Sequence, residues 1–227
     1  MQNIDTIRID LPNSWRQVPA DREGMEVVTA AMRATAQWAS MKPSERRQFE
    51  LLLQRLVIDA EGVGVRFAAV YSDVPDAASV GDEAAADDGA ETAVANAAYL
   101  VVSVLSSADI GTTLPLTPAV LESALSMQRP PTNGSATHTN LAPPEPVTIQ
   151  AGPAVVLRRL VEQRFGRDTS LQFYSHAYFV PVPDAPDRLV VLQFLTPHVG
   201  EAELFGRYFA AVSNGLRFYA EGEPTTL

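Results

Sequence analysis

Two apolar runs separated by a Pro/Asp-rich piece give the clearest pattern in the chain, at residues 171–195. In both runs apolar residues occupy odd and even positions, so both sides of an extended chain are apolar. In the first run Leu171, Phe173, Ser175, Ala177 and Phe179 share one side, and Gln172, Tyr174, His176, Tyr178 and Val180 share the other. A strand with two apolar faces is covered on both of them. The pattern therefore predicts an antiparallel hairpin joined at 180–188, within a sheet that is sandwiched between other elements.

Further strands are predicted where apolar residues alternate or run continuously. These are 6–15, 63–74 and 97–107, and a Gly152–Pro153 break divides 147–165 into two extended segments. Trp15, at the end of the first of these, is expected to anchor the core. A helix over 153–165 is the competing interpretation, because Val156, Leu160 and Val161 would also share a helix face. The β-branched residues of this segment favour the strand.

Helices are predicted where apolar residues recur near every 3.6 positions. They cover 22–40, the segment from Pro43 to a stop at Gly62, 117–127, and the segment that follows Thr196. In the helix over 117–127, Thr117 fits the N-cap and Pro118 the first helical position, and Thr196 and Pro197 fit the same two positions of the last helix. Its core face would hold Phe205, Phe209, Val212 and Leu216, and Asn214–Gly215 would end or bend it.

Two stretches have compositions that disfavour packing. Residues 75–96 hold six acidic residues and no basic or aromatic one, and residues 129–146 are rich in Pro, Ser, Thr, Asn and Gly. Such an acidic segment buries too little apolar area to offset an ordering cost of roughly 1–2 kcal/mol per residue. We expect one α/β domain over 1–227, with a flexible acidic insertion at 75–96 and a flexible Pro-rich linker at 129–146.

Charge and composition restrict the classes of partner and compartment. A net charge of −10 argues against a nucleic-acid partner, because phosphates require a basic face. The chain has no cysteine, which excludes disulfides and thiolate metal sites. The first residues lack the basic and apolar regions of a signal peptide, and no apolar run reaches the roughly 18–20 residues of a membrane span. We therefore expect a cytoplasmic protein with no membrane partner.

The candidate functional residues lie on the predicted strands. His176 lies between Tyr174 and Tyr178 on one strand face. This arrangement suits a hydrogen-bonded histidine packed between aromatic rings, or one wall of a ligand pocket. Arg158 and Arg159 would point to opposite faces of their strand, either as solvated charges or as partner contacts.

The sequence contains no pattern typical of catalysis, cofactor binding or metal binding. His138, His176 and His198 fall in different predicted elements and have no helical ligand spacing. The HExxH, GxSxG, P-loop and GxGxxG motifs are absent. Asp184 and Asp187 flank Pro186, and turn chemistry accounts for them. We therefore predict no catalytic residues, no cofactor and no metal.

Three segments carry a family resemblance: "DLPNSWRQVP" (10–19), "YFVPVPDAPDRLVVLQFLTP" (178–197) and "VTIQAGPAVVLRR" (147–159). The first is similar to the LP-x-x-W opening of the PsbP-like family, and the second resembles that family's final hairpin. The third is similar to a strand pair of its actinobacterial LpqN-type members. The resemblance implies an α/β (α+β) fold, with an antiparallel sheet of about six strands sandwiched by helices. It implies binding roles and no active site. The 75–96 and 129–146 stretches depart from the family pattern.

These observations predict a non-catalytic binding or accessory protein of the bacterial cytoplasm that acts through contacts with a protein partner. Two alternatives stay open. One is a small-molecule-binding protein, or an enzyme without a familiar motif, with its pocket near Tyr174, His176 and Tyr178. The other is a self-assembling protein, such as a homodimer, joined through an exposed sheet edge or helix face.

Overall fold

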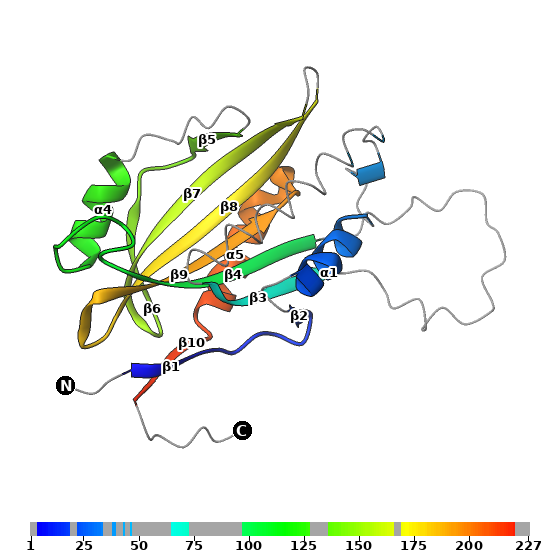
Figure 1. Ribbon diagram of the computed structural model, residues 1–227. Helices are drawn as coiled ribbons and strands as arrows, with labels where there is room; N and C mark the ends of the chain where they lie inside the picture. Colours follow the sequence, from blue (N-terminus) through cyan, green and yellow to red (C-terminus); the bar gives the residue numbers. More distant parts are fainter. Residues whose placement is uncertain are drawn as a thin grey trace.

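Antiparallel strands make up most of the structure, an α+β fold shown in Figure 1. This is a computed structural model that describes residues 4–18, 22–33, 38–39, 43, 46, 65–72, 97–127, 136–165 and 169–220. In the described part, one sheet has eight strands and a second has two. No helix of that part is long and apolar enough to cross a membrane.

The large sheet is antiparallel at every junction. Its strand order is β2 (Trp15–Val18), β3 (Val65–Ser72), β4 (Ala97–Ser106), β9 (Ala185–Thr196), β8 (Thr169–Val182), β7 (Gly152–Phe165) and β5 (Ala136–Asn140). β6 (Glu145–Ile149) also pairs with β7, beside the half of β7 that β5 leaves free. The small sheet joins β1 (Ile4–Ile9) to β10 (Leu216–Ala220). The predicted sheet of about six strands was therefore too small, because the predictions lacked β5 and gave no separate strand to 15–18.

The predicted hairpin is confirmed as β8 and β9. The two strands pair antiparallel from Tyr174 opposite Thr196 to Val182 opposite Ala185. Between them Asp184 has a φ of 57°, a conformation that aspartate tolerates better than most residues. The competing interpretation for 153–165 is also decided, since these residues form β7 and pair with β8 over its length.

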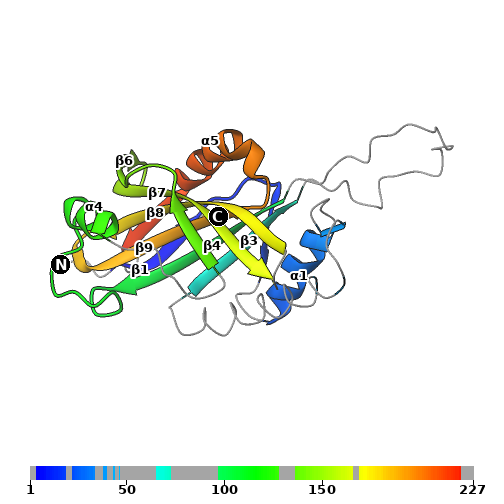
Figure 2. The ribbon, with the colours of Figure 1, turned by 90° about the horizontal axis from the view of Figure 1, so that it is seen from above.

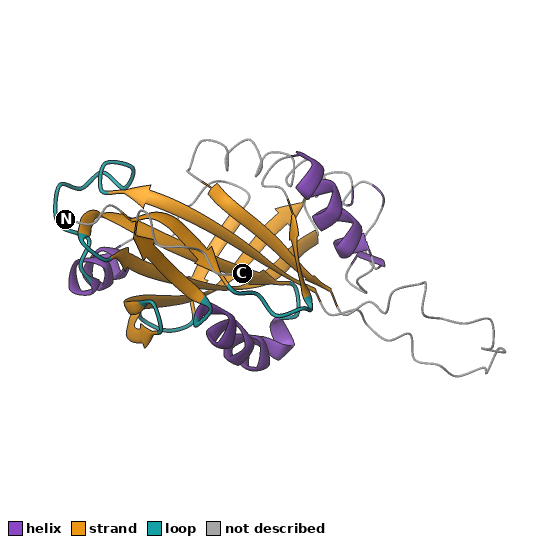
Figure 3. Ribbon diagram, turned by 90° about the horizontal axis from the view of Figure 1, so that it is seen from below, coloured by secondary structure: helices purple, strands orange, loops and turns teal. Residues whose placement is uncertain are grey.

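Helices cover both faces of this sheet. α5 (Ala202–Ser213) lies on one face, where Phe205, Phe209 and Val212 pack on Tyr178, Leu192 and Phe194. α4 (Pro118–Met127) lies on the other face, where Leu121 and Leu125 pack on Val155, Leu157 and Leu189. α1 (Arg22–Arg33) runs near β2, β3 and β4, on the opposite side of the sheet from α5 (Figures 2 and 3). The two apolar faces of β7 and β9 thus each have their own cover.

The start of the last helix differs from the prediction. Thr196 is the final residue of β9, and its hydroxyl donates to the Ala97 carbonyl at 2.8 Å and accepts from the His198 N–H at 3.2 Å. A 3-10 turn, η1 (Val199–Glu201), follows before α5 begins. Thr196 is fully buried, so its hydroxyl joins β9 to the start of β4 and does not cap the helix. In contrast, the predicted cap Thr117 does accept from the Val120 N–H.

The C-terminal strand β10 was missed by the sequence analysis. Leu216 was assigned to the face of the last helix, but it begins β10 opposite Ile9 and is buried in the same cluster as Phe209. The turn before it brings Gly215 against the backbone of Asp10, whose N–H donates to the Gly215 carbonyl at 2.9 Å. A side chain at Gly215 would collide with that backbone, so glycine is required there.

The predicted flexible linker over 129–146 is wrong for its second half. Residues 136–146 form β5 and the start of β6, and both pair with β7. The backbone N–H and C=O groups along the outer edge of the long strand β7 need hydrogen-bond partners. These polar residues supply them despite their composition. The predicted acidic insertion at 75–96 lies outside the described residues. So does most of the helix predicted from Pro43 to Gly62, of which Pro43 and Arg46 are described and are helical.

Replacing Phe209 by alanine should lower the free energy of unfolding by about 3–5 kcal/mol, the range for deleting a buried aromatic ring. Phe209 is fully buried and stacks on Phe194 with ring centroids 4.7 Å apart. Leu204→Ala on the same helix is the matched control, because Leu204 is 55% exposed. It should change stability by no more than about 0.5 kcal/mol. Urea denaturation checks both variants, and similar losses would show that α5 is not anchored through Phe209.

Candidate functional site

The predicted aromatic row on β8 lies beneath α5. Tyr174, His176 and Tyr178 share the face that α5 covers, and they are 4%, 2% and 4% exposed. The His176 ring stacks on Tyr178 with centroids 4.9 Å apart and meets Phe209 edge-on at 6.2 Å. Tyr174 stacks on Phe209 at 6.4 Å. A ligand could touch this row only if α5 moved away, so the row is not the wall of an open pocket.

One hydrogen bond lies within the row, and a second joins the row to α5. The Tyr174 hydroxyl lies 3.2 Å from His176 Nδ1, and Tyr178 bonds to Ser213 on α5. His176 Nε2 is buried and has no hydrogen-bond partner among the residues that the structure describes. Burial, followed by the positive charge of Arg158, lowers the pKa of His176 to about 4. His176 is therefore neutral at pH 7, and burial raises the pKa of both tyrosine hydroxyls.

Gly206 is the α5 residue that passes over the Tyr174–His176 pair. A Cβ at this position would lie 3.1 Å from the Tyr174 hydroxyl and 3.7 Å from His176 Nδ1. Helix interiors usually prefer alanine to glycine, by about 1 kcal/mol. The close approach of α5 to the hydroxyl explains why glycine occupies this position.

The two candidate arginines point to opposite faces of β7, as predicted. Arg158 is the cross-strand neighbour of His176 and forms an ion pair with Glu145 of β6, at 2.8 Å. Arg159 donates from Nε to Asn140 Oδ1 of β5, at 2.9 Å. Arg158 therefore belongs to the edge of the aromatic row, and Arg159 does not. Each arginine ties a short strand to β7, although an exposed ion pair contributes only about 0–1 kcal/mol.

The chemistry available to this row is limited. A neutral imidazole beside a tyrosine hydroxyl is a possible general base, but α5 shields both groups from a substrate. Within the described residues, no group of three or more histidine or acidic side chains is arranged to hold a metal ion. The contacts make the row a buried polar layer that orients α5 on the sheet.

A second cluster, which the sequence analysis did not assemble, surrounds Trp15. Its Nε1 donates to the Tyr208 hydroxyl at 2.8 Å, and Ser14 shares that hydroxyl at the same distance. The Trp15 ring stacks near Tyr208 and meets Phe194 edge-on, with centroids 6.1 Å apart in both cases. The prediction that Trp15 anchors the core is confirmed by its 7% exposure. The partner on α5 lies 193 positions away, so local sequence gave no signal for it.

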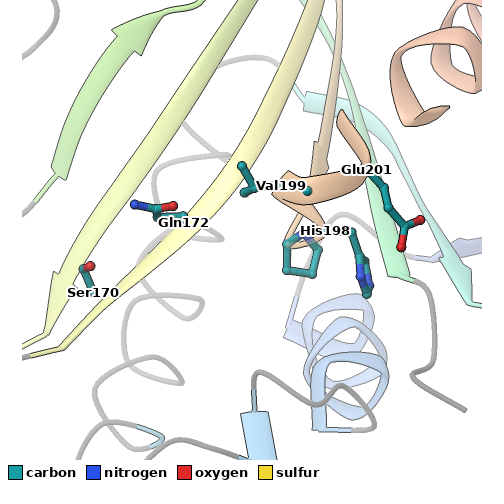
Figure 4. A pocket seen from close by; sticks show the side chains of 7 residues that line it. Ser170, Gln172, His198, Val199 and Glu201 are labelled. Atoms are coloured by element: carbon teal, nitrogen blue, oxygen red, sulfur yellow. The ribbon is translucent and has the colours of Figure 1, made fainter. Parts of the chain in front are cut away.

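One open cleft lies where β9 ends, shown in Figure 4. It has a volume of about 400 Å³ and is lined by Ser170, Gln172, Pro197, His198, Val199, Gly200 and Glu201. His198 is committed to the fold, since its Nε2 accepts from the Ala97 N–H at 3.2 Å and its ring stacks on Phe205. The side chains of Ser170 and Gln172 point away from that of Glu201 (Figure 4). The cleft therefore lacks the convergent polar groups that fix a small ligand.

Comparison with solved structures finds a distant structural neighbour of this chain. No protein-family model and no curated protein matches the chain. Among solved structures, the fold is similar to that of LpqN, described as involved in cell envelope biogenesis of Mycobacterium tuberculosis. The two share 9% sequence identity with a TM-score of 0.37, over 94% of this chain and 83% of that one. The relationship to LpqN is distant, and nothing further about this chain rests on it.

Replacing Gly206 by alanine should have opposite effects in two backgrounds. In the natural sequence the new Cβ meets the Tyr174 hydroxyl, so stability should stay the same or fall. In a Tyr174→Phe background the hydroxyl is gone, and the same change should stabilise by up to about 1 kcal/mol. Urea denaturation of the four proteins gives the coupling free energy. Equal effects in both backgrounds would show that the hydroxyl does not determine the residue at 206.

Lowering the pH should destabilise the protein through His176. Its folded pKa lies below its unfolded value, so the unfolded chain binds more protons between pH 6.5 and about 4. The contribution of neutral His176 to the free energy of unfolding is therefore fully present above pH 6.5. Below that pH it decreases by up to about 1.4 kcal/mol per pH unit, and the loss reaches about 3 kcal/mol by pH 4. A His176→Phe variant keeps the ring stacking and should lose this slope. Denaturation curves from pH 7.5 to 4 that run parallel for both proteins would contradict the assignment.

Proposed function

We propose that this chain is a non-catalytic binding or accessory protein that acts through protein–protein contacts. The proposal rests on the positions of the large exposed apolar side chains of this chain. Four of the five in the described part are on the loop before α4, at the end of α4 and in the loop after β5: Ile110, Leu114, Met127 and Leu141.

These four side chains are 42–74% exposed. The loop with Ile110 and Leu114 leads into α4, which packs on β6 and β7, and the Leu141 N–H donates to the Arg158 carbonyl of β7 at 2.9 Å. Single exposed apolar residues are ordinary, but a group on neighbouring segments is typical of a contact surface. We call these four residues the α4 surface. In contrast, the aromatic row on β8 is enclosed, which favours a surface contact over a bound small molecule.

We also propose a PsbP-like architecture for the chain. Support comes from the residues that carried the resemblance. Trp15 of the LP-x-x-W segment packs against the C-terminal helix through Tyr208, and the final hairpin leads into that helix through Thr196 and Pro197. Cytoplasmic localisation stays a prediction, and cell fractionation with an antibody against the protein tests it.

When the full chain is captured from cells that produce it naturally, a protein partner should be recovered with it in a stoichiometric amount. We expect this partner to bind to the α4 surface. Placing charge there, as Leu114→Glu with Met127→Glu, should weaken the purified partner's binding at least tenfold, because truncating a central apolar anchor typically costs about 2 kcal/mol. Leu204→Glu is the matched control, since Leu204 is equally exposed but lies on α5. Binding that is unchanged by the double variant, or capture without a partner, would contradict the proposal.

A further inference from the structure

The strand β5 ends the large sheet, with one edge on β7 and no further described strand on its other side. It lies at the margin of the sheet, away from α5 and α1 (Figure 1). Thr137, Thr139 and Asn140 are exposed and His138 is half-buried. An edge of this kind presents a row of backbone N–H and C=O groups to a pairing strand.

The register identifies which residues present those groups. The Leu141 N–H donates to the Arg158 carbonyl, and this pair continues the β5–β7 register of Asn140 opposite Arg159. In an antiparallel ladder, alternate residues bond to the same neighbour. Thr137 and Thr139 therefore bond to β7. Ala136, His138 and Asn140 direct their backbone groups to the outer edge.

The side chains of β5 suit pairing with an identical strand. Its sequence, Ala-Thr-His-Thr-Asn, has no charged residue at neutral pH, and it is centred on His138. A twofold axis there would place Thr137 opposite Thr139 of the second copy, and Thr–Thr pairs are favourable across antiparallel strands. The edge strands β2 and β10 contain Arg16 and Arg217, and an antiparallel edge that pairs with itself suffers when like charges oppose one another. Natural edges are usually protected by charge or proline, and β5 has neither.

We propose that two copies of this chain pair through β5, antiparallel and in register about His138, to form one continuous sheet across a twofold dimer. His138 would face itself as a hydrogen-bonded pair, and Ala136 would face Asn140 of the second copy. The contact uses the backbone edge of β5, and of the α4 surface only Leu141 adjoins that strand, so the contact does not rest on the proposed heterologous partner. The net charge of −10 opposes association, but salt near 0.15 M screens charges beyond about 8 Å.

The absence of natural cysteine allows a direct test by cross-linking. In the proposed pair the two His138 Cα atoms are about 5.5 Å apart, within the roughly 4.4–6.8 Å that a disulfide spans. H138C should therefore form a covalent dimer under mild oxidation. T137C alone should not, because its copies are more than about 7 Å apart. An equal mixture of T137C and T139C chains should cross-link, since these positions oppose each other. Cross-linking of T137C alone, or none with H138C, would overturn the register.

A second experiment separates the backbone from the side chain. H138P removes an outward N–H and leaves the bonds to β7 intact, whereas H138A keeps that N–H. Light scattering at 0.15 M salt should show a dimer for the natural sequence and H138A. H138P should raise the dimer dissociation constant at least about tenfold. A136P removes another outward N–H, at the first strand position, and should act alike if H138P folds poorly by circular dichroism. A monomeric natural protein, or a dimer that survives both proline variants, would overturn the proposal.

Discussion

The stacking of Phe209 on Phe194 joins the C-terminal helix to the centre of the large sheet, and the rest of the α5 side is arranged around it. Phe194 lies on β9, next to the strand that carries His176, and Phe209 touches both Tyr174 and His176. Once this pair is fixed, neighbouring α5 residues have fixed partners. Tyr208 meets Trp15, Gly206 passes over Tyr174, and Ser213 bonds to Tyr178. One aromatic contact thus sets the position of a helix, an N-terminal strand and a buried polar layer.

That polar layer is a source of specificity more than of stability. A buried imidazole with one satisfied nitrogen is less favourable than an apolar ring of the same size, because Nε2 loses its water without gaining a partner. The Tyr99 hydroxyl of β4 is a second buried group without a partner among the described residues, and burial raises its pKa. The Tyr174–His176 bond does, however, fix where α5 can approach the sheet, since a Cβ at position 206 would lie only 3.1 Å from the Tyr174 hydroxyl.

Because this layer is enclosed, contacts with other proteins are expected at the margin of the sheet and not at its middle. The residues with the most promising chemistry in the sequence are covered, while the side chains of the α4 surface are exposed and no described strand pairs with the outer edge of β5. Both open features adjoin β7, the long strand whose outer edge is shared by β5 and β6. The arginines of β7 secure those two short strands, Arg158 through Glu145 and Arg159 through Asn140. Contacts with other proteins at this margin would leave the aromatic core undisturbed.

The sequence by itself determined the local elements whose signals are contained within about ten residues. Alternation identified β8 and β9 with both faces apolar, the Gly152–Pro153 break separated β6 from β7, and Thr117–Pro118 marked the start of α4. It also placed Arg158 and Arg159 on opposite faces and Trp15 in the core.

Only the tertiary structure decided what depends on partners distant in the chain. The sequence predicts Thr196 as a helix cap, yet its hydroxyl donates to the Ala97 carbonyl, 99 positions away. Residues 136–140 read as a flexible stretch, yet the unpaired edge of β7 gives them backbone partners. The sequence pattern is compatible with two roles for the row of Tyr174, His176 and Tyr178, as a pocket wall or as part of the packed core. The burial of the row follows from the position of α5. In each case a polar group acts on a hydrogen-bond or packing partner that the fold brings to it, and such pairings leave no periodicity in the sequence.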